Sequence, residues 1–410
     1  MTSPAPAHEI ATRRALQRNL RLLPWWWAAR WIWLGEGIWV IYLTTERHLT
    51  VGEVLLFQAI YSAVVIAAEV PTGIVADRWG RRLSVLLGCA VGAGAMLTFG
   101  LAHTVPLLLL SYALFSVASA LFSGADSALL FDTLRGLGRD GEFTRWQARE
   151  RVIAGASTGA YTLLGSLMVR WLPLSAPFVL SGVLSVAGVL LTLALSEPPR
   201  EARRRSFAGI GFHAARTVLG RRPLLGAAVL MALTTAAIQT MGVAQQPVAL
   251  AYGVPVWSLG LFVGAQLAFS AGCAAIADRL GRRAGLTLLF LAMPLVSALA
   301  LLGGAGGMLW LYPVFILPSL GWNVLWPHVT DYIARRVDGG VRATALSVAS
   351  VLDQLTSAAA LPLFGYAIDR HGLDAGLAIA SAALAALVVA AFVFWWSGGD
   401  RAHAGAAASA

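Results

Sequence analysis

Twelve apolar runs of about 20 residues dominate this chain of 410 residues. A helix of that length is about 30 Å long, the thickness of the hydrocarbon core of a bilayer. Only 12% of the residues are charged, whereas soluble domains carry about 25%. The sequence therefore predicts an all-α integral membrane protein whose partner is the lipid bilayer, with spans near 24–45, 52–73, 83–103, 105–133, 152–171, 174–195, 223–246, 255–276, 284–303, 307–329, 343–366 and 374–396.

The cationic residues are distributed unevenly between the two sides of the predicted membrane. All 30 are arginine, and 26 of them fall in one set of loops and tails; the others are Arg30, Arg47, Arg170 and Arg370. Because arginine is enriched on the cytoplasmic side, we expect both termini to be cytoplasmic in a multi-pass protein of the cell inner (plasma) membrane. The net charge of +10 then follows from topology, and we expect no nucleic-acid partner.

A basic stretch near the midpoint leaves six predicted spans on either side. Asp77 and Asp278, 201 residues apart, each follow the second span of their half, so the halves share an orientation and form a parallel repeat. The predicted organisation is a cytoplasmic N-terminal arm (1–22), an N-terminal six-helix half (23–196), a basic cytoplasmic linker (197–222), a C-terminal six-helix half (223–397) and a cytoplasmic tail (398–410).

One charged loop occurs twice, as GIVADRWGRR at 73–82 and AIADRLGRR at 275–283. The first copy resembles the signature loop G-x-x-x-D-R-x-G-R-R of the major facilitator superfamily. EVPTGIVADRWGRR, SGADSALLFDTL and VRATALSVAS are similar to a bacterial branch of that family whose substrates are mostly unassigned. The resemblance covers essentially the whole chain. It implies twelve transmembrane helices in two halves around a central cavity, and transport by alternating access.

The repeated loop predicts a gating latch. Gly80 and Gly281 supply the backbone freedom that a tight turn needs. The resemblance implies that Asp77 faces the start of the eleventh span when the cytoplasmic side is closed, and that Arg78 or Arg81 pairs with Asp132. The arginines also satisfy the positive-inside rule alone, and Ala274 replaces the first glycine of the second copy. The latch candidates are Gly73, Asp77, Arg78, Gly80, Arg81, Asp132, Asp278, Arg279, Gly281, Arg282 and Arg342.

An ionisable residue inside a span costs about 2.5–3.5 kcal/mol and is a functional candidate, and five such residues are singled out here. Glu36 and Asp353 lie near mid-membrane, whereas Arg30, Glu69 and Asp126 lie in the cytoplasmic third and form a plausible structural or gating cluster. On a continuous helix, Glu36 is rotated about 240° from Arg30, so the two would not pair. An unpaired carboxyl group suits proton coupling, although a satisfied polar residue is the alternative.

The resemblance assigns the cavity mainly to the first, fourth, seventh and tenth spans. Their candidate residues are Trp31, Trp33, Trp39, Gln239, Gln245, Gln246, Trp322, Asn323 and Trp326. Indoles, amides and a few acids suit an amphipathic or cationic organic molecule. Trp25, Trp26 and Trp27 are expected in an interfacial aromatic belt. Drug–proton antiporters of the family usually carry an arginine in the fourth span and a proline in a glycine-rich run of the fifth. Here the fourth span has no arginine, and the run GASTGAYTLLG in the fifth has no proline.

These observations favour a secondary active transporter, with proton-coupled efflux by an antiporter as the leading subclass. A proton-coupled nutrient importer is the alternative, and a non-transporting membrane receptor or scaffold is an alternative of another class. No P-loop or nucleophile elbow is present. We therefore expect that the protein is not an enzyme, that it has no cofactor, and that the proton gradient is its energy source. The histidines are scattered, which predicts no metal site. We expect a monomer that binds a small-molecule substrate.

Overall fold

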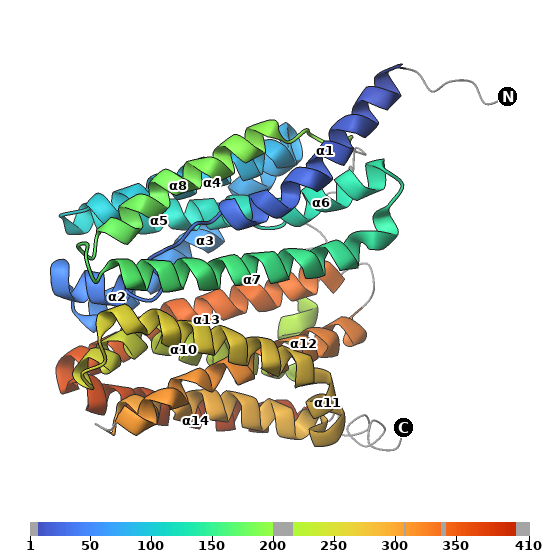
Figure 1. The fold of residues 1–410 in the computed structure, drawn as a ribbon. Coiled ribbons are helices and arrows are strands. Elements are labelled where there is room, and N and C mark those ends of the chain that lie inside the picture. Colours follow the sequence, from blue (N-terminus) through green and yellow to red (C-terminus); the bar gives the residue numbers. More distant parts are fainter. Residues whose placement is uncertain (1–6, 200–215, 307–308, 338–341, 399–410) are drawn as a thin grey trace. The chain divides into compact units, whose positions relative to one another are not determined.

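The computed structural model describes residues 7–199, 216–306, 309–337 and 342–398, and every regular element in these ranges is a helix (Figure 1). The elements of the first half are α1 (Ala7–Ala29), α2 (Trp39–Ile41), the π-helix η1 (Tyr42–Glu46), α3 (Val51–Trp79), α4 (Arg81–Leu101), α5 (Val105–Phe122), α6 (Ala125–Gly136), η2 (Asp140–Glu142), α7 (Phe143–Met168) and α8 (Ala176–Ala194). Those of the second half are α10 (Arg222–Ala251), η3 (Val256–Ser258), α11 (Leu259–Leu299), η4 (Ala300–Gly304), η5 (Leu309–Ile316), α12 (Pro318–Arg336), α13 (Arg342–His371) and α14 (Leu373–Ser397).

Eight segments of the described residues are long and apolar enough to cross a membrane. One of them, Val256–Gly304, contains both the eighth and the ninth predicted spans, separated by a backbone break at Gly285. The first, fifth and tenth predicted spans are outside this set. The first is interrupted, the fifth carries several charges, and the tenth follows a 3-10 segment. None of the three therefore has a continuous, apolar helical window of 18 residues.

The described residues form two compact units. One lies within Met1–Trp39 and Val64–Arg203, and the other within Val40–Ala63 and Arg204–Ala410. In the first unit α4 packs against α5 and α8, and in the second α10 packs against α13 and α14 while α11 packs against α12. Most of the predicted linker 197–222 lies outside the described residues.

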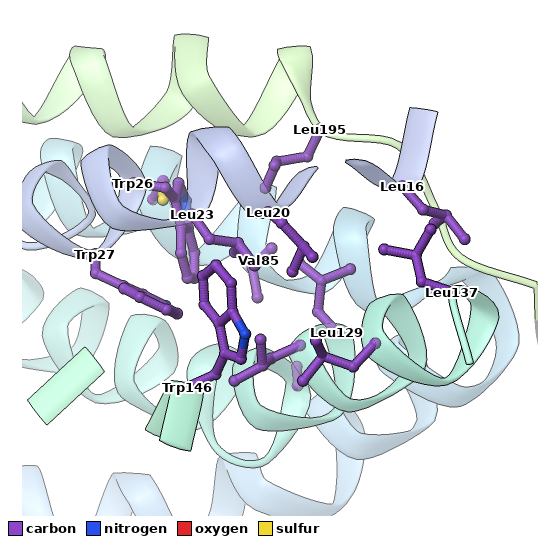
Figure 2. Close-up of a cluster of buried hydrophobic side chains, with 14 residues drawn as sticks. Leu16, Leu20, Leu23, Trp26, Trp27, Val85, Leu129, Leu137, Trp146 and Leu195 are labelled. Carbon is purple, nitrogen blue, oxygen red and sulfur yellow. The ribbon is translucent and has the colours of Figure 1, made fainter. Parts of the chain in front are cut away.

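The core of the first unit is built on α1 (Figure 2). Leu20, Leu23 and Trp26 are buried together with Val85 of α4 and Leu129 of α6. Residues 7–22, predicted as a cytoplasmic arm, are therefore the first part of a helix that packs against the bundle. The three tryptophans expected in an interfacial belt do not all lie at the surface. Trp26 and Trp27 are buried, at 0% and 3% exposure, and of the three only Trp25, at 71%, can contact lipid or water.

The first span is interrupted between α1 and α2, where Arg30–Ile38 has no regular helix. Non-helical backbone at membrane depth needs partners from the protein. Helices α7 and α8 supply them: the Tyr161 hydroxyl donates to the Ala28 carbonyl (2.9 Å), and the Leu34 amide donates to the Ser181 hydroxyl (2.9 Å). Gly165 contacts the Leu34 carbonyl directly, because it has no side chain in the way.

The fourth span is also interrupted. Gly124 has a φ of 72°, in the left-handed region that favours glycine, and it separates α5 from α6. The new helix begins at Ala125, so Asp126 lies in its first turn. The first span thus breaks at Arg30 and the fourth next to Asp126, and both of these residues are charged.

The two copies of the charged loop fold differently. Gly80 has a φ of 123° and makes the turn between α3 and α4, as predicted. In the second copy the helix continues through Gly281, and the break comes four residues later at Gly285, with a φ of 72°. Gly281 is instead a packing position, because a Cβ there would overlap the His328 imidazole. The prediction that Gly281 makes the turn is therefore wrong.

Candidate functional site

Three charged side chains meet at the two helix breaks of the first unit. Arg30 Nη1 donates to Asp126 Oδ2 (2.5 Å) and Arg30 Nη2 donates to Glu150 Oε1 (2.8 Å). We call these three residues the Arg30 cluster. Their side chains are 18%, 17% and 15% exposed, so solvent screens them only partly. One guanidinium faces two carboxylates, which leaves a net charge of −1 when both are ionised.

The surroundings hold the guanidinium in one place. Its Cζ atom lies 5.2 Å from the ring centre of Trp26 and 5.9 Å from that of Phe122, which is cation–π geometry. Asp126 has a second partner, since the Ser127 amide donates to its Oδ1 (2.6 Å). Glu150 is held through the guanidinium that it shares with Asp126. The additional bond from the Ser127 amide makes Asp126 the more firmly held of the two carboxylates.

The sequence pattern predicts Glu69 in this cluster and does not indicate Glu150. Glu69 is exposed on α3, while Glu150 lies two turns into α7, which begins about ten residues before the predicted fifth span. In the sequence Glu150 stands between two arginines, a pattern typical of a solvated cytoplasmic loop. Because α7 begins before the predicted fifth span, Glu150 lies on a helix and not in a loop. A prediction of this earlier helix start would have placed Glu150 next to the membrane.

Glu36 lies in the interrupted segment between α1 and α2 and is half-buried. The indole of Trp33 hydrogen-bonds its carboxyl group. Glu36 and Arg30 would point away from each other on a continuous helix, but the helix is interrupted between them, so their relative orientation does not follow from the helical repeat. Glu36 remains a candidate on the basis of its depth alone.

Trp31 and Trp33 belong to an aromatic cluster in the first unit. The Trp33 ring centre is 5.3 Å from that of Phe115 and 5.3 Å from that of Phe178, and Trp31 lies 6.2 Å from Phe122. Both indoles are half-buried, so part of each is free for a ligand. Trp39, at the start of α2, is likewise half-buried.

In the second unit, Asp353 lies on a polar seam between α10 and α13. It is 6% exposed and hydrogen-bonded to Thr235, and its Oδ1 has no hydrogen-bond partner among the described residues. One turn along, Gln239 donates to the Ser357 hydroxyl (3.2 Å). A buried acid on such a seam suits a structural role as well as proton transfer.

Besides Gln239, two more of the predicted cavity amides hydrogen-bond to the protein. Gln246 is 1% exposed, and its Oε1 accepts from the amides of Val40 (2.9 Å) and Ile41 (3.3 Å), so it caps the second part of the first span. Asn323 donates to the Ser270 hydroxyl (2.6 Å). Gln245 is also buried, at 7% exposure.

The tenth span presents a pair of indoles. Trp322 and Trp326 of α12 are stacked, with ring centres 4.7 Å apart and planes 28° apart. Trp322 is 36% exposed, which leaves a flat aromatic face accessible. Such a face binds apolar or cationic groups.

One ion pair expected at the repeated loop is formed in the first unit. Arg81, not Arg78, forms an ion pair with Asp132, and the Arg81 amide donates to Glu197 Oε1 (3.0 Å). Gly73, Asp77 and Arg78 are exposed on α3.

In the second unit Asp278 pairs with Arg282 one turn away on the same helix, and both are more than half exposed. Arg279 is also exposed. The side chain of Arg342, the predicted partner region of Asp77, lies outside the described residues.

Comparisons with known proteins place this geometry in a family. Residues 33–360 match the model of the Major Facilitator Superfamily. A crystal structure of a mutant of the nucleoside transporter NupG superposes with a TM-score of 0.77 at 15% identity, covering 94% of this chain and 100% of that one. A bacterial homologue of the human lysosomal transporter Spinster, inward-facing and unoccupied, gives 0.72 at 14% identity, with 94% and 97% covered. A POT family transporter in complex with a thioalcohol-conjugated peptide gives 0.72 at 13%, with 93% and 97% covered.

Comparison with curated protein sequences finds no relative. These three structural neighbours are below 25% identity and so establish the fold. The family model covers most of the chain, from the first predicted span to the eleventh, and includes both charged loops. The chain belongs to the Major Facilitator Superfamily.

Proposed function

We propose that this protein is a secondary active transporter that moves a small organic solute by alternating access, and that proton exchange at the Arg30 cluster drives efflux of an amphipathic or cationic compound. The observation that carries the proposal is the sharing of Arg30 by Asp126 and Glu150. A guanidinium that already neutralises one carboxylate leaves the second free to bind a proton or a cation.

The position of the cluster supports coupling to conformational change. Its members lie at the break of the first span, at the break of the fourth span, and on α7. Interrupted helices are places where backbone angles change at low cost, so protonation of one carboxylate would alter how these segments are held together. The cluster therefore joins a chemical event to elements that can move.

Exposed aromatic side chains within each unit support the proposed class of solute. The indoles of Trp31 and Trp33 are partly exposed in the first unit, and those of Trp322 and Trp326 in the second, and the described charges inside the spans are mainly acidic. Phosphates or dicarboxylates would need arginines at mid-membrane. The solved neighbours named for nucleosides and peptides make these compounds necessary members of any test panel.

The test is flux in proteoliposomes under an imposed pH gradient. A panel of lipophilic cations, neutral drugs, nucleosides, peptides and sugars is offered to the wild type, to Glu150→Gln and, as a matched control, to Asp140→Asn, an exposed acid before α7. We expect a cation to move against its gradient in the wild type and in Asp140→Asn. Glu150→Gln should keep exchange of the compound across the membrane without a gradient but lose accumulation.

Two results would contradict this proposal. Accumulation of a nucleoside, peptide or sugar in the direction of proton flow would make the protein an importer. Accumulation by Glu150→Gln at the wild-type level would remove the Arg30 cluster from coupling and move attention to Glu36 and Asp353.

A further inference from the structure

A buried carboxylate without a cationic partner lies in the interior of α13. Asp353 is 6% exposed, and its Oδ1 accepts no hydrogen bond from the described residues. The other charged residues of α13 stand at the two ends of the helix. Within the described ranges, no arginine or histidine pairs with Asp353. A buried carboxylate in this condition needs either a proton or a cation to offset the loss of water.

Neutral oxygen atoms surround this carboxylate where α10 packs against α13. Thr235 of α10 hydrogen-bonds to Asp353, and one turn further along both helices Gln239 Nε2 donates to the Ser357 hydroxyl (3.2 Å). The two pairs advance together, so they lie about 5.4 Å apart along the helix axes. An ion midway between the pairs is about 2.7 Å from each of them in that direction.

The hydroxyl of Thr235 is drawn away from its own helix. Thr234 and Thr240, also buried on α10, each donate to the carbonyl one turn earlier at 2.8 Å. The corresponding distance from Thr235 to the Met231 carbonyl is 3.3 Å. Its single proton has two acceptors, the Met231 carbonyl and Asp353. When the proton turns to Met231, the lone pairs of the hydroxyl are left for a cation beside Asp353.

Gln239 supplies a further oxygen. Its Nε2 is held by Ser357, and its Oε1 accepts no hydrogen bond from another described residue. The four side chains therefore offer one carboxylate, two hydroxyls and one amide oxygen. These are the oxygen ligands that hard cations prefer. A protonated Asp353 would need only one acceptor and would leave the Gln239 oxygen unused.

The charge and the burial of the four residues decide which cation fits. One carboxylate and one monovalent ion leave no net charge in a low-dielectric interior, whereas a divalent ion leaves an uncompensated positive charge. Thr235 and Ser357 are 7% and 0% exposed, so the substituents of an organic ammonium ion have no room beside them. Sodium has nearly the radius of calcium, which takes oxygen ligands at about 2.3–2.6 Å. That distance suits the spacing of the two pairs better than the longer bonds of potassium do.

We propose that Asp353, Thr235, Gln239 and Ser357 bind a sodium ion, with Asp353 as the anionic ligand. The ion would join α10 to α13, since each helix supplies two of the four side chains. All four residues belong to the second unit, whereas the Arg30 cluster belongs to the first. The assignment is therefore independent of the transported solute and of proton exchange at the Arg30 cluster.

The experiment measures binding of radioactive sodium to the purified full-length protein in detergent. Sodium is titrated at constant ionic strength with choline as the replacement cation, and potassium is added as a competitor. Melting temperatures are recorded in the same buffers. The variants are Asp353→Asn and Thr235→Val.

Two control variants match these changes. Thr234→Val removes a buried hydroxyl from the next position of α10, where the side chain lies against Gly321 of α12 and not against α13. Asp374→Asn removes an exposed carboxylate from α14.

We expect the wild type to bind one sodium ion and to melt at a higher temperature in sodium than in choline, because the ion binds only the folded state. Asp353→Asn should lose both effects. Thr235→Val should bind sodium about 10-fold to 100-fold more weakly, as is usual when a group that supports a metal site is lost. Both controls should behave like the wild type. If Asp353→Asn fails to fold, Thr235→Val still provides the test, because it keeps the carboxylate.

Four outcomes would overturn the proposal. Absence of sodium binding by the folded wild type would leave Asp353 without the proposed ligand. Wild-type binding by folded Asp353→Asn would place the ion elsewhere. Equal losses in Thr234→Val and Thr235→Val would show an effect of packing and not of a ligand. Equal affinity for potassium would contradict the assignment of sodium.

Discussion

Arg30 and Glu150 are 120 residues apart in the chain, yet the Arg30 guanidinium donates to the Glu150 carboxylate at 2.8 Å. The contact joins the break in the first span to α7. Together with Asp126 it makes one positive and two negative charges that are each less than one-fifth exposed. Groups in this state respond strongly to the loss of any one member.

Replacement of Arg30 by methionine should destabilise the protein at neutral pH. Two partly buried carboxylates lose their shared donor, and each hydrogen bond to a charged group contributes about 1.5–3 kcal/mol. The expected result is a lower melting temperature in detergent. The double variant Arg30→Met, Glu150→Gln should recover part of the loss, since it removes the repulsion between carboxylates; no recovery would argue against the cluster geometry.

Gly165 and Gly155 lie on the same helix and should respond in opposite ways to alanine. A Cβ at Gly165 would overlap the Leu34 carbonyl, whereas a Cβ at Gly155 would meet nothing within 4 Å. Gly165→Ala should cost about 1–3 kcal/mol through overpacking of the interrupted first span. Gly155→Ala should leave the melting temperature unchanged or slightly raised. Equal melting temperatures would mean that α7 does not pack against the interruption.

Asp369 of α13 holds the start of α3. Its Oδ1 accepts from the Gly52 amide (2.9 Å) and its Oδ2 from the Thr50 hydroxyl (2.7 Å). Asp369→Leu should lower the hydrogen-exchange protection of the amides at residues 52–54 by about 10-fold to 100-fold, as the charged acceptor is lost. Asp374→Leu, at an exposed acid of α14, is the control. Unchanged protection in Asp369→Leu would show that α3 is capped by other means.

Asp77→Asn tests the proposed cytoplasmic latch. The exposed carboxylate of Asp77 should hold the closed cytoplasmic state, so its neutralisation should increase the labelling of cysteines introduced on cytoplasmic cavity faces. Asp140→Asn provides an acid of similar exposure outside the latch. If both variants label at the wild-type rate, Asp77 contributes to the loop fold and not to gating.

The charged loop shows how far local sequence predicts local structure. Gly80 makes the turn that its sequence indicates, since glycine alone adopts its φ of 123° at low cost. The same motif in the second half contains Gly281, but the helix there continues to Gly285. His328 packs against Gly281 from α12, and that contact between distant residues occupies the position where a turn was expected.

The sequence by itself determined the membrane class, the helical fold and the repeat. Twelve apolar runs can bury their backbone in a bilayer only as helices, and two copies of one loop reveal a duplicated plan. Only the tertiary structure decided which charges meet. The ion pair of Arg30 with Glu150, where Glu69 was expected, depends on where the helices break and how they cross. The same is true of the hydrogen bond from the Val40 amide to Gln246. Those breaks are stabilised by contacts between distant residues, which hydrophobic patterning along the chain does not encode.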